Sequence, residues 1–197
     1  AYLDEKGLTE LANISAAITT EFENVPAAAL ATLATKRPVS PSAESVAIAQ
    51  NRVAEKAHFV ACAAKGGADA ITVAPYAVIE TAVDVVAIAD DLLPGILKTT
   101  RLGYDGKGQI RVATQAELTA AFAELGGVTC VLEKMLPLKA EYSVILARGR
   151  DGQVVHELPV LAPVVRDVEP ALVAEQHVSR VARVDPERVV VRVDARL

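Results

Sequence analysis

The stretch that decides the fold reads GILKTTRLGYDGKGQIRV and spans residues 95–112. Its first part, Gly95–Thr99, and its last part, Ile110–Val112, are rich in aliphatic and β-branched residues, which predicts a strand at each end. Residues 100–109 hold three closely spaced glycines, which predict a loop. A loop that joins two strands is neither a Walker loop nor a Rossmann turn, because those lead from a strand into a helix.

The glycine-rich loop has two interpretations. Glycine permits positive φ and close backbone approach, and successive N–H groups in such a loop can bind phosphate oxygens, with Lys107 adding a cation. A structural turn explains the same composition. Lys98, in the strand before the loop, is either a phosphate ligand or a solvent-facing residue on an edge strand, because burying a lysine without a partner is costly.

Helices and strands alternate around this stretch. We expect helices at residues 4–17, 26–35, 42–65 and 115–125, and at least partial helix at 81–92. We expect an extended segment broken by Pro75 at 71–79, and strands at 18–22, 128–133, 142–148, 154–158 and 188–193. Asp4, Ser42 and Thr114 are the expected N-caps. Arg150-Asp151-Gly152 predicts a hairpin turn. Strands that alternate with helices and then pair in hairpins indicate an α/β or α+β class.

Composition excludes several classes of protein. The net charge of −5 over 197 residues argues against DNA or RNA as the main partner, and no apolar run reaches the roughly 18 residues of a membrane helix. Cys62 and Cys130 predict two reduced core thiols in a cytoplasmic protein. His58, His156 and His177 have no partner at metal-ligand spacing, so no zinc site is expected.

Three further groups of polar residues each have a structural and a functional interpretation. Glu133 and Lys134, at the end of a predicted strand, can offer backbone groups to an adenine edge, and Glu141 can bind ribose hydroxyls; as surface residues they need no such role. Arg52 and Lys56 lie one helical turn apart, as solvated surface pairs do. Glu21 either binds a sugar or stabilises a helix N-terminus.

Taken in order along the chain, these segments resemble the N5-carboxyaminoimidazole ribonucleotide synthase family of ATP-grasp ligases. The similar segments are Thr20–Pro26, Pro38–Pro41, Ala49–Arg52 with Glu55-Lys56, Leu97–Thr99, Gly103–Gln109, Leu132–Lys134 followed by Glu141, and Ala147–Gly149 with Asp151-Gly152. The resemblance covers about residues 1–159. It implies an ATP-grasp-like fold at residues 46–159, a remnant of a preceding Rossmann-like α/β domain at 1–45, and an unassigned segment at 160–197.

The resemblance also implies a reaction and a set of binding residues. The family uses ATP, Mg²⁺ and bicarbonate to make carboxyphosphate, and then carboxylates aminoimidazole ribonucleotide in purine biosynthesis. Tyr104 and Lys107 would be catalytic, and Glu21 and Tyr104 would lie toward the ribonucleotide. The residues implied in nucleotide binding are Arg52, Lys98, Gly103, Gly106, Lys107, Gly108, Gln109, Glu133, Lys134, Leu136 and Glu141.

The chain also departs from the family pattern. We expect it to be truncated at both ends, because the family's first strand and Gly-rich turn precede Ala1 and the magnesium ligands have no counterpart in residues 169–197. The metal ligands therefore stay unassigned. A catalytically incomplete nucleotide-binding fragment or scaffold, and another ATP-grasp carboxylate–amine ligase, are the alternatives. We also expect a homo-oligomer, since relatives dimerise and a truncated sheet exposes strand edges.

Overall fold

The chain forms two compact units, Ala1–Leu136 and Pro137–Leu197. The computed structural model describes residues 2–22, 24–66, 72–103, 107–138, 141–143, 145–149, 151–156, 160–162 and 190–191. None of the described helices has the length and apolar content needed to cross a membrane. The two units are described separately below.

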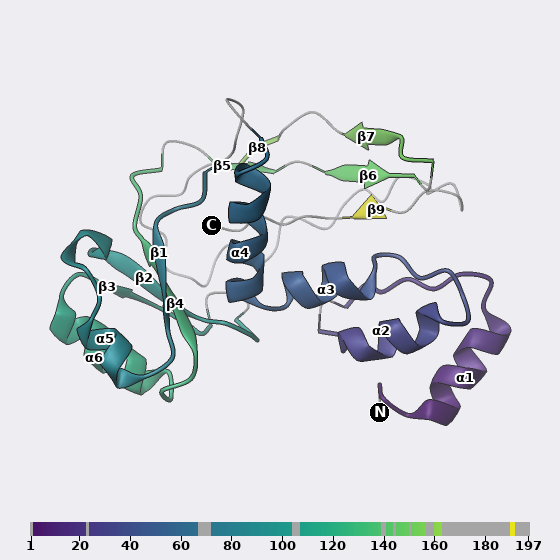
Figure 1. The fold of residues 1–197 in the computed structure, drawn as a ribbon, viewed down its shortest axis with the longest axis horizontal. Helices are drawn as coiled ribbons and strands as arrows, with labels where there is room; N and C mark the ends of the chain where they lie inside the picture. The colour runs from purple at the N-terminus through teal and green to yellow at the C-terminus, as the bar shows by residue number, and fades with distance from the viewer. Residues whose placement is uncertain are drawn as a thin grey trace. The chain divides into compact units, whose positions relative to one another are not determined.

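The first unit contains a four-stranded antiparallel sheet, drawn at the left of Figure 1. Its strands are β1 (Tyr76–Ile79), β2 (Gly95–Thr99), β3 (Gln109–Val112) and β4 (Cys130–Lys134), in the order β1-β4-β2-β3. β2 and β3 correspond to the two strands predicted on either side of the glycine-rich loop, and they pair as an antiparallel hairpin with Lys98 opposite Gln109. Because β2 lies between β4 and β3, the expectation that Lys98 stands on an edge strand is wrong.

Two helices pack side by side on this sheet (Figure 1). They are α5 (Ala82–Val86) and α6 (Gln115–Glu124), and Thr114 caps α6 as predicted. Helix was expected at 81–92, but only α5 and a short 3-10 turn, η2 (Asp90–Leu92), form there. Three valines in five residues give α5 little propensity to continue. The core beneath the helices is aliphatic, with Ile79, Leu97, Leu118 and Leu132 fully buried.

The N-terminal part of the first unit is helical. It contains α1 (Glu5–Ile14), α2 (Ala27–Ala34), α3 (Ala43–Ala49) and α4 (Arg52–Ala63), with Asp4 and Ser42 capping α1 and α3 as predicted. The single helix expected at 42–65 is wrong. Asn51 interrupts it, because its Oδ1 accepts hydrogen bonds from the N–H groups of Val53 and Ala54 and so starts a new helix.

The strand expected at 18–22 is also wrong. Only Ile18 pairs, in a single parallel bridge with Val39. The Ile18 N–H donates to Pro38 O at 2.9 Å, and the Ser40 N–H donates to Ile18 O at 3.0 Å. Beyond the bridge the Thr20 hydroxyl donates to Phe22 O, a local side-chain bond that competes with an extended strand.

The second unit contains short antiparallel pairs. β5 (Glu141–Ser143) pairs with β8 (Val160–Ala162), and β6 (Leu146–Arg148) pairs with both β7 (Val154–His156) and β9 (Val190–Val191). The hairpin predicted at Asp151-Gly152 is confirmed, and Gly152 has the positive φ of 84° that such turns favour in glycine. The strand expected at 142–148 is two strands.

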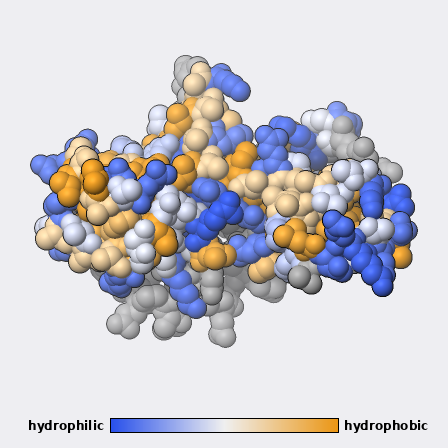
Figure 2. Space-filling model, turned by 60° about the horizontal axis from the view of Figure 1, so that its bottom comes forward, coloured by the Kyte–Doolittle hydropathy of each residue, from blue (hydrophilic) through white to orange (hydrophobic). Residues whose placement is uncertain are grey.

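The face of the molecule shown in Figure 2 carries apolar side chains in several separate places among polar ones. On α5 of the first unit, Val83 and Val86 are 76% and 78% exposed. Isolated exposed apolar residues are normal on protein surfaces. These two valines provide controls for the buried residues below.

The packing of α6 on the sheet yields a prediction about stability. Replacing Leu118 with alanine removes a fully buried side chain, and we expect the free energy of unfolding to fall by about 2–5 kcal/mol. Urea unfolding followed by circular dichroism measures it. Val86→Ala, on the exposed side of α5, should change it by less than about 0.5 kcal/mol. Equal effects of the two substitutions would contradict the described core.

Candidate functional site

The end of β2 is joined to the start of α4. The Arg52 N–H donates to Thr100 O at 3.0 Å, and Arg52 Nε donates to Thr99 O at 3.2 Å. Thr100 is held in turn by the carbonyl of Thr129, which precedes β4. These bonds fix the Arg52 guanidinium at the point where the glycine-rich loop leaves β2.

Two glycines of the loop lie in tight surroundings, and at Gly108 a larger residue does not fit. A Cβ on Gly108 would stand 2.5 Å from Thr99 Oγ1, and Gly108 has a φ of +70°. A Cβ on Gly103 would stand 3.3 Å from Arg52 Nη2. The Thr99 N–H donates to Gly108 O at 2.8 Å, so the two ends of the loop meet beside Arg52. Tyr104 and Gly106 lie outside the described residues.

Three charged side chains meet in the interior next to this loop. Lys98 Nζ donates to Glu133 Oε2 at 2.9 Å, and Lys56 Nζ pairs with Glu133 Oε1 at 3.2 Å. They come from β2, β4 and α4. The exposed fractions of Lys98, Glu133 and Lys56 are 3%, 7% and 7%. We call these three residues the ion cluster.

The protonation of the surrounding carboxyl groups reflects this arrangement. Burial alone would raise the pKa of Glu133, but the hydrogen bond from Lys98 and the charges of Lys98 and Lys56 outweigh it and lower the pKa. Glu55, half-buried on α4, behaves in the opposite way. Burial raises its pKa, and the nearby Arg52 and Lys56 only partly offset that effect.

The site carries an excess of positive charge. Arg52, Lys56 and Lys98 supply three cations, while Glu55 and Glu133 supply two carboxylates when ionised, which leaves one positive charge. Partly buried cations attract an anion more strongly than exposed ones do, because water screens them less. A loop with backbone N–H groups and an adjacent arginine is chemistry that fits a phosphate. The described residues therefore fit the phosphates of a nucleotide.

The structure brings together some of the predicted nucleotide-binding residues. Two of them, Gly103 and Gly108, lie in the loop, and Arg52 lies beside it. Two others, Lys98 and Glu133, belong to the ion cluster. Gln109 begins β3 opposite Lys98, and Lys107 precedes Gly108 in the turn.

The other predicted residues of the first unit have different partners or are exposed. The Lys134 N–H donates to Pro75 O at 2.9 Å, and Leu136, beyond the end of β4, is 42% exposed. Glu21 is exposed in the bend after the Ile18 bridge. Glu141 belongs to the second unit, and its side chain is outside the described residues. Roles for these residues stay predictions.

Sequence reasoning missed Lys56 and undervalued the Glu133 side chain. The surface interpretation of both residues is wrong, because both are buried and paired. The available signal was the spacing from Arg52 to Lys56, which places Lys56 on the same helical face as a residue already assigned to the loop. A glutamate inside the aliphatic run of β4 was the matching signal, because a charge in such a strand requires a partner.

Two expectations about thiols and metals are corrected. Cys62 is exposed rather than in the core, and its Sγ lies 3.5 Å from His58 Nε2 one helical turn away. His58 therefore does have a cysteine neighbour. Within the residues that the structure describes, no group of three His, Cys, Asp or Glu side chains is arranged to hold a metal ion. The magnesium ligands stay unassigned.

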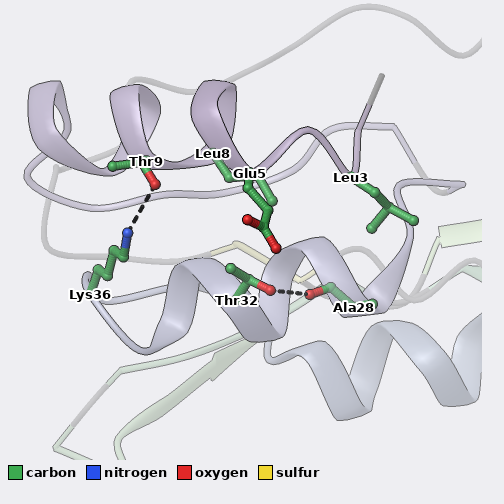
Figure 3. Close-up of a pocket in the computed structure, with 7 residues that line it drawn as sticks. All are labelled: Leu3, Glu5, Leu8, Thr9, Ala28, Thr32 and Lys36. Carbon is green, nitrogen blue, oxygen red and sulfur yellow. Dashed lines mark hydrogen bonds between the residues drawn. The ribbon is translucent and has the colours of Figure 1, made fainter.

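A separate hollow lies between α1 and α2 (Figure 3). Three of its polar side chains bind one another or the helix backbone: Lys36 Nζ donates to Thr9 Oγ1 at 3.0 Å, and Thr32 Oγ1 donates to Ala28 O at 3.0 Å. The hollow contains no residue of the glycine-rich loop or of the ion cluster. We therefore do not assign it to the candidate site.

Two family models match the chain. The ATP-grasp domain matches residues 67–185, and the ribonucleotide synthetase preATP-grasp domain matches residues 1–50. The predicted ATP-grasp-like α/β fold with part of a preceding domain is thereby confirmed. Within the first of these ranges lie Lys98, Glu133 and the glycine-rich loop.

Individual relatives agree with the family models. The N5-carboxyaminoimidazole ribonucleotide synthase of Pseudomonas aeruginosa is 40% identical over 153 residues, which are 77% of this chain and 41% of the relative. The crystal structure of the synthetase from Thermus thermophilus is similar with a TM-score of 0.69 and 32% identity, over 81% of this chain and 41% of that one.

An ADP complex of an N5-carboxyaminoimidazole ribonucleotide synthetase is similar with a TM-score of 0.73 and 31% identity, over 89% of this chain and 46% of that one. The chain spans about two fifths of the length of the curated relatives it matches. The chain therefore belongs to the ATP-grasp family, and these relatives within it are N5-carboxyaminoimidazole ribonucleotide synthases.

Proposed function

We propose that this chain binds ATP and serves the carboxylation of aminoimidazole ribonucleotide by bicarbonate, a step of purine biosynthesis. The proposal rests on one observation: the ion cluster, which has a net positive charge, lies next to the glycine-rich loop. The relatives that the chain resembles are synthases of the carboxylated ribonucleotide, and one similar structure is an ADP complex.

The residues divide into roles by their chemistry. Arg52 and Lys98 would bind phosphate oxygens, because both present cations where the loop begins. Gly103 to Gln109 would close over the phosphates, with Lys107 and Tyr104 at the reacting groups. Residues Glu133–Leu136 would line the adenine pocket, Glu141 would take the ribose, and Glu21 would lie toward the ribonucleotide.

The reaction transfers the γ-phosphoryl group of ATP to bicarbonate and releases ADP. The resulting carboxyphosphate passes its carboxyl group to the substrate amine and releases phosphate. Phosphoryl transfer needs little covalent chemistry from a protein, so cations and backbone N–H groups contribute mainly by neutralising charge and by positioning. Mg²⁺ would supply further neutralisation on the phosphates.

Nucleotide binding is the first test. We expect the chain to bind ADP with Mg²⁺ in isothermal titration calorimetry, and we expect Lys98→Met to weaken the binding about 10- to 100-fold. A hydrogen bond to a charged group is worth about 1.5–3 kcal/mol, which corresponds to that range.

Lys65→Met provides the matched control, because Lys65 is exposed after the end of α4 and its loss changes the net charge equally. Its affinity for ADP should stay within about twofold of the unaltered chain, since exposed charges interact weakly. An unchanged affinity in Lys98→Met would exclude Lys98 as a phosphate ligand.

Turnover is the second test. We expect ADP release from ATP, Mg²⁺ and bicarbonate to require aminoimidazole ribonucleotide, measured by a coupled assay with each component omitted in turn. Release that proceeds equally well without the ribonucleotide would reject the carboxylation. ADP binding without any release would instead support the alternative of a nucleotide-binding fragment. Release driven by a different amine would support another carboxylate–amine ligase.

A further inference from the structure

Glu133 divides its carboxylate between two lysines, one on each oxygen. Lys98 Nζ lies 2.9 Å from Oε2 and Lys56 Nζ lies 3.2 Å from Oε1. Every member of this group is at least nine-tenths buried. Among buried side-chain polar atoms of the described residues, none lacks a hydrogen-bond partner. The ion cluster is therefore a closed arrangement in which one anion is paired with two cations.

This closure poses a problem for phosphate binding by Lys98. To turn toward a phosphate, Lys98 must weaken its bond to Glu133. Removing one partner of a buried ion pair is strongly unfavourable, because it leaves an uncompensated buried charge. Lys56 solves this problem, since it keeps Glu133 neutralised while Lys98 moves.

We propose that Lys56 is a positioning residue that acts through Glu133 and makes Lys98 available to the nucleotide. The inference rests on the proposed function, and it adds a residue that does not itself touch the nucleotide. Lys56 is well placed for this role. It comes from the buried face of α4, and its Nζ lies 5.8 Å from the centre of the Tyr76 ring, which gives the ammonium a second, weaker partner.

Other charged groups face the cluster and enter the balance. On α4 these are Arg52, which reaches Thr99 O, and Glu55, whose pKa is raised by burial. Glu55 interacts electrostatically with Arg52 and with all three residues of the ion cluster, and it repels Glu133. Tyr76 on β1 contributes its ring. Substituting Lys56 therefore leaves one cation fewer near two carboxylates.

The experiment is a double-mutant cycle on ADP binding in the full chain. Lys56→Met should weaken the binding of ADP with Mg²⁺ about tenfold, because Lys98 then stays with Glu133. In a Glu133→Gln background the same substitution should have an effect of at most about threefold, since no carboxylate is left to hold Lys98. Interaction energies of this size are typical of residues in one ion-pair network.

A pH series gives a readout that a purely structural lysine would not move. Without Lys56, Glu133 keeps the burial that raises its pKa and loses one of the charges that lower it. Protonation of Glu133 then releases Lys98. The ADP affinity of Lys56→Met should therefore approach that of the unaltered chain as the pH falls from 8 to 5.5. Because the two affinities are compared as a ratio at each pH, the titration of ADP itself cancels.

Three controls complete the design. Lys56→Arg retains the charge and should bind ADP within about threefold of the unaltered chain, Lys65→Met should behave as the unaltered chain, and circular dichroism with thermal unfolding verifies that each variant is folded. A folded Lys56→Met chain with unchanged ADP affinity would overturn the inference and leave the proposed function intact.

Two other results would also decide the matter. An equal loss on Lys56→Met in both backgrounds would mean that Lys56 binds the nucleotide directly, which overturns the role through Glu133. No ADP binding by the unaltered chain would overturn both this inference and the proposed function.

Discussion

The first unit depends on the burial of three charged groups, Lys56, Lys98 and Glu133, in one contact. Each would be costly to bury alone. The contact therefore requires β2, β4 and α4 to come together, and the bonds from Arg52 to Thr99 and Thr100 reinforce the same alignment. Local capping serves this arrangement too, because Asn51 starts a new helix where α4 must turn toward the sheet.

The same constraint connects fold to chemistry. Because Lys98 points from a central strand into the cluster, the glycine-rich loop that follows β2 begins beside a fixed cation. Thr99 and Gly108 close the base of the loop, and the absence of a Cβ at Gly108 allows that approach. The loop is thus anchored at its ends by the hairpin, while the charges beneath it are held by the rest of the sheet.

The sequence predicted the strands at 95–99 and 110–112, and the caps Asp4, Ser42 and Thr114, because those features are local. The burial of Lys56 was not predictable in that way, since it arises from a strand far along the chain. The break at Asn51 was visible in principle, because asparagine is a strong N-cap, but the long apolar periodicity of residues 42–65 obscured it. The strand expected at 18–22 does not form because only Ile18 finds backbone partners, the carbonyl of Pro38 and the N–H of Ser40, which flank Val39.

Stability alone does not account for the ion cluster. Apolar side chains of similar volume in place of a buried ion pair are often neutral or stabilising, and the neighbouring core of Leu97, Leu118 and Leu132 shows that this sheet can be packed in that way. An arrangement with two lysines for one glutamate also leaves a net positive charge where burial penalises charge. A ligand that brings its own negative charge relieves that penalty. The excess cation is therefore the feature of this sheet that the proposed binding of a nucleotide phosphate would explain.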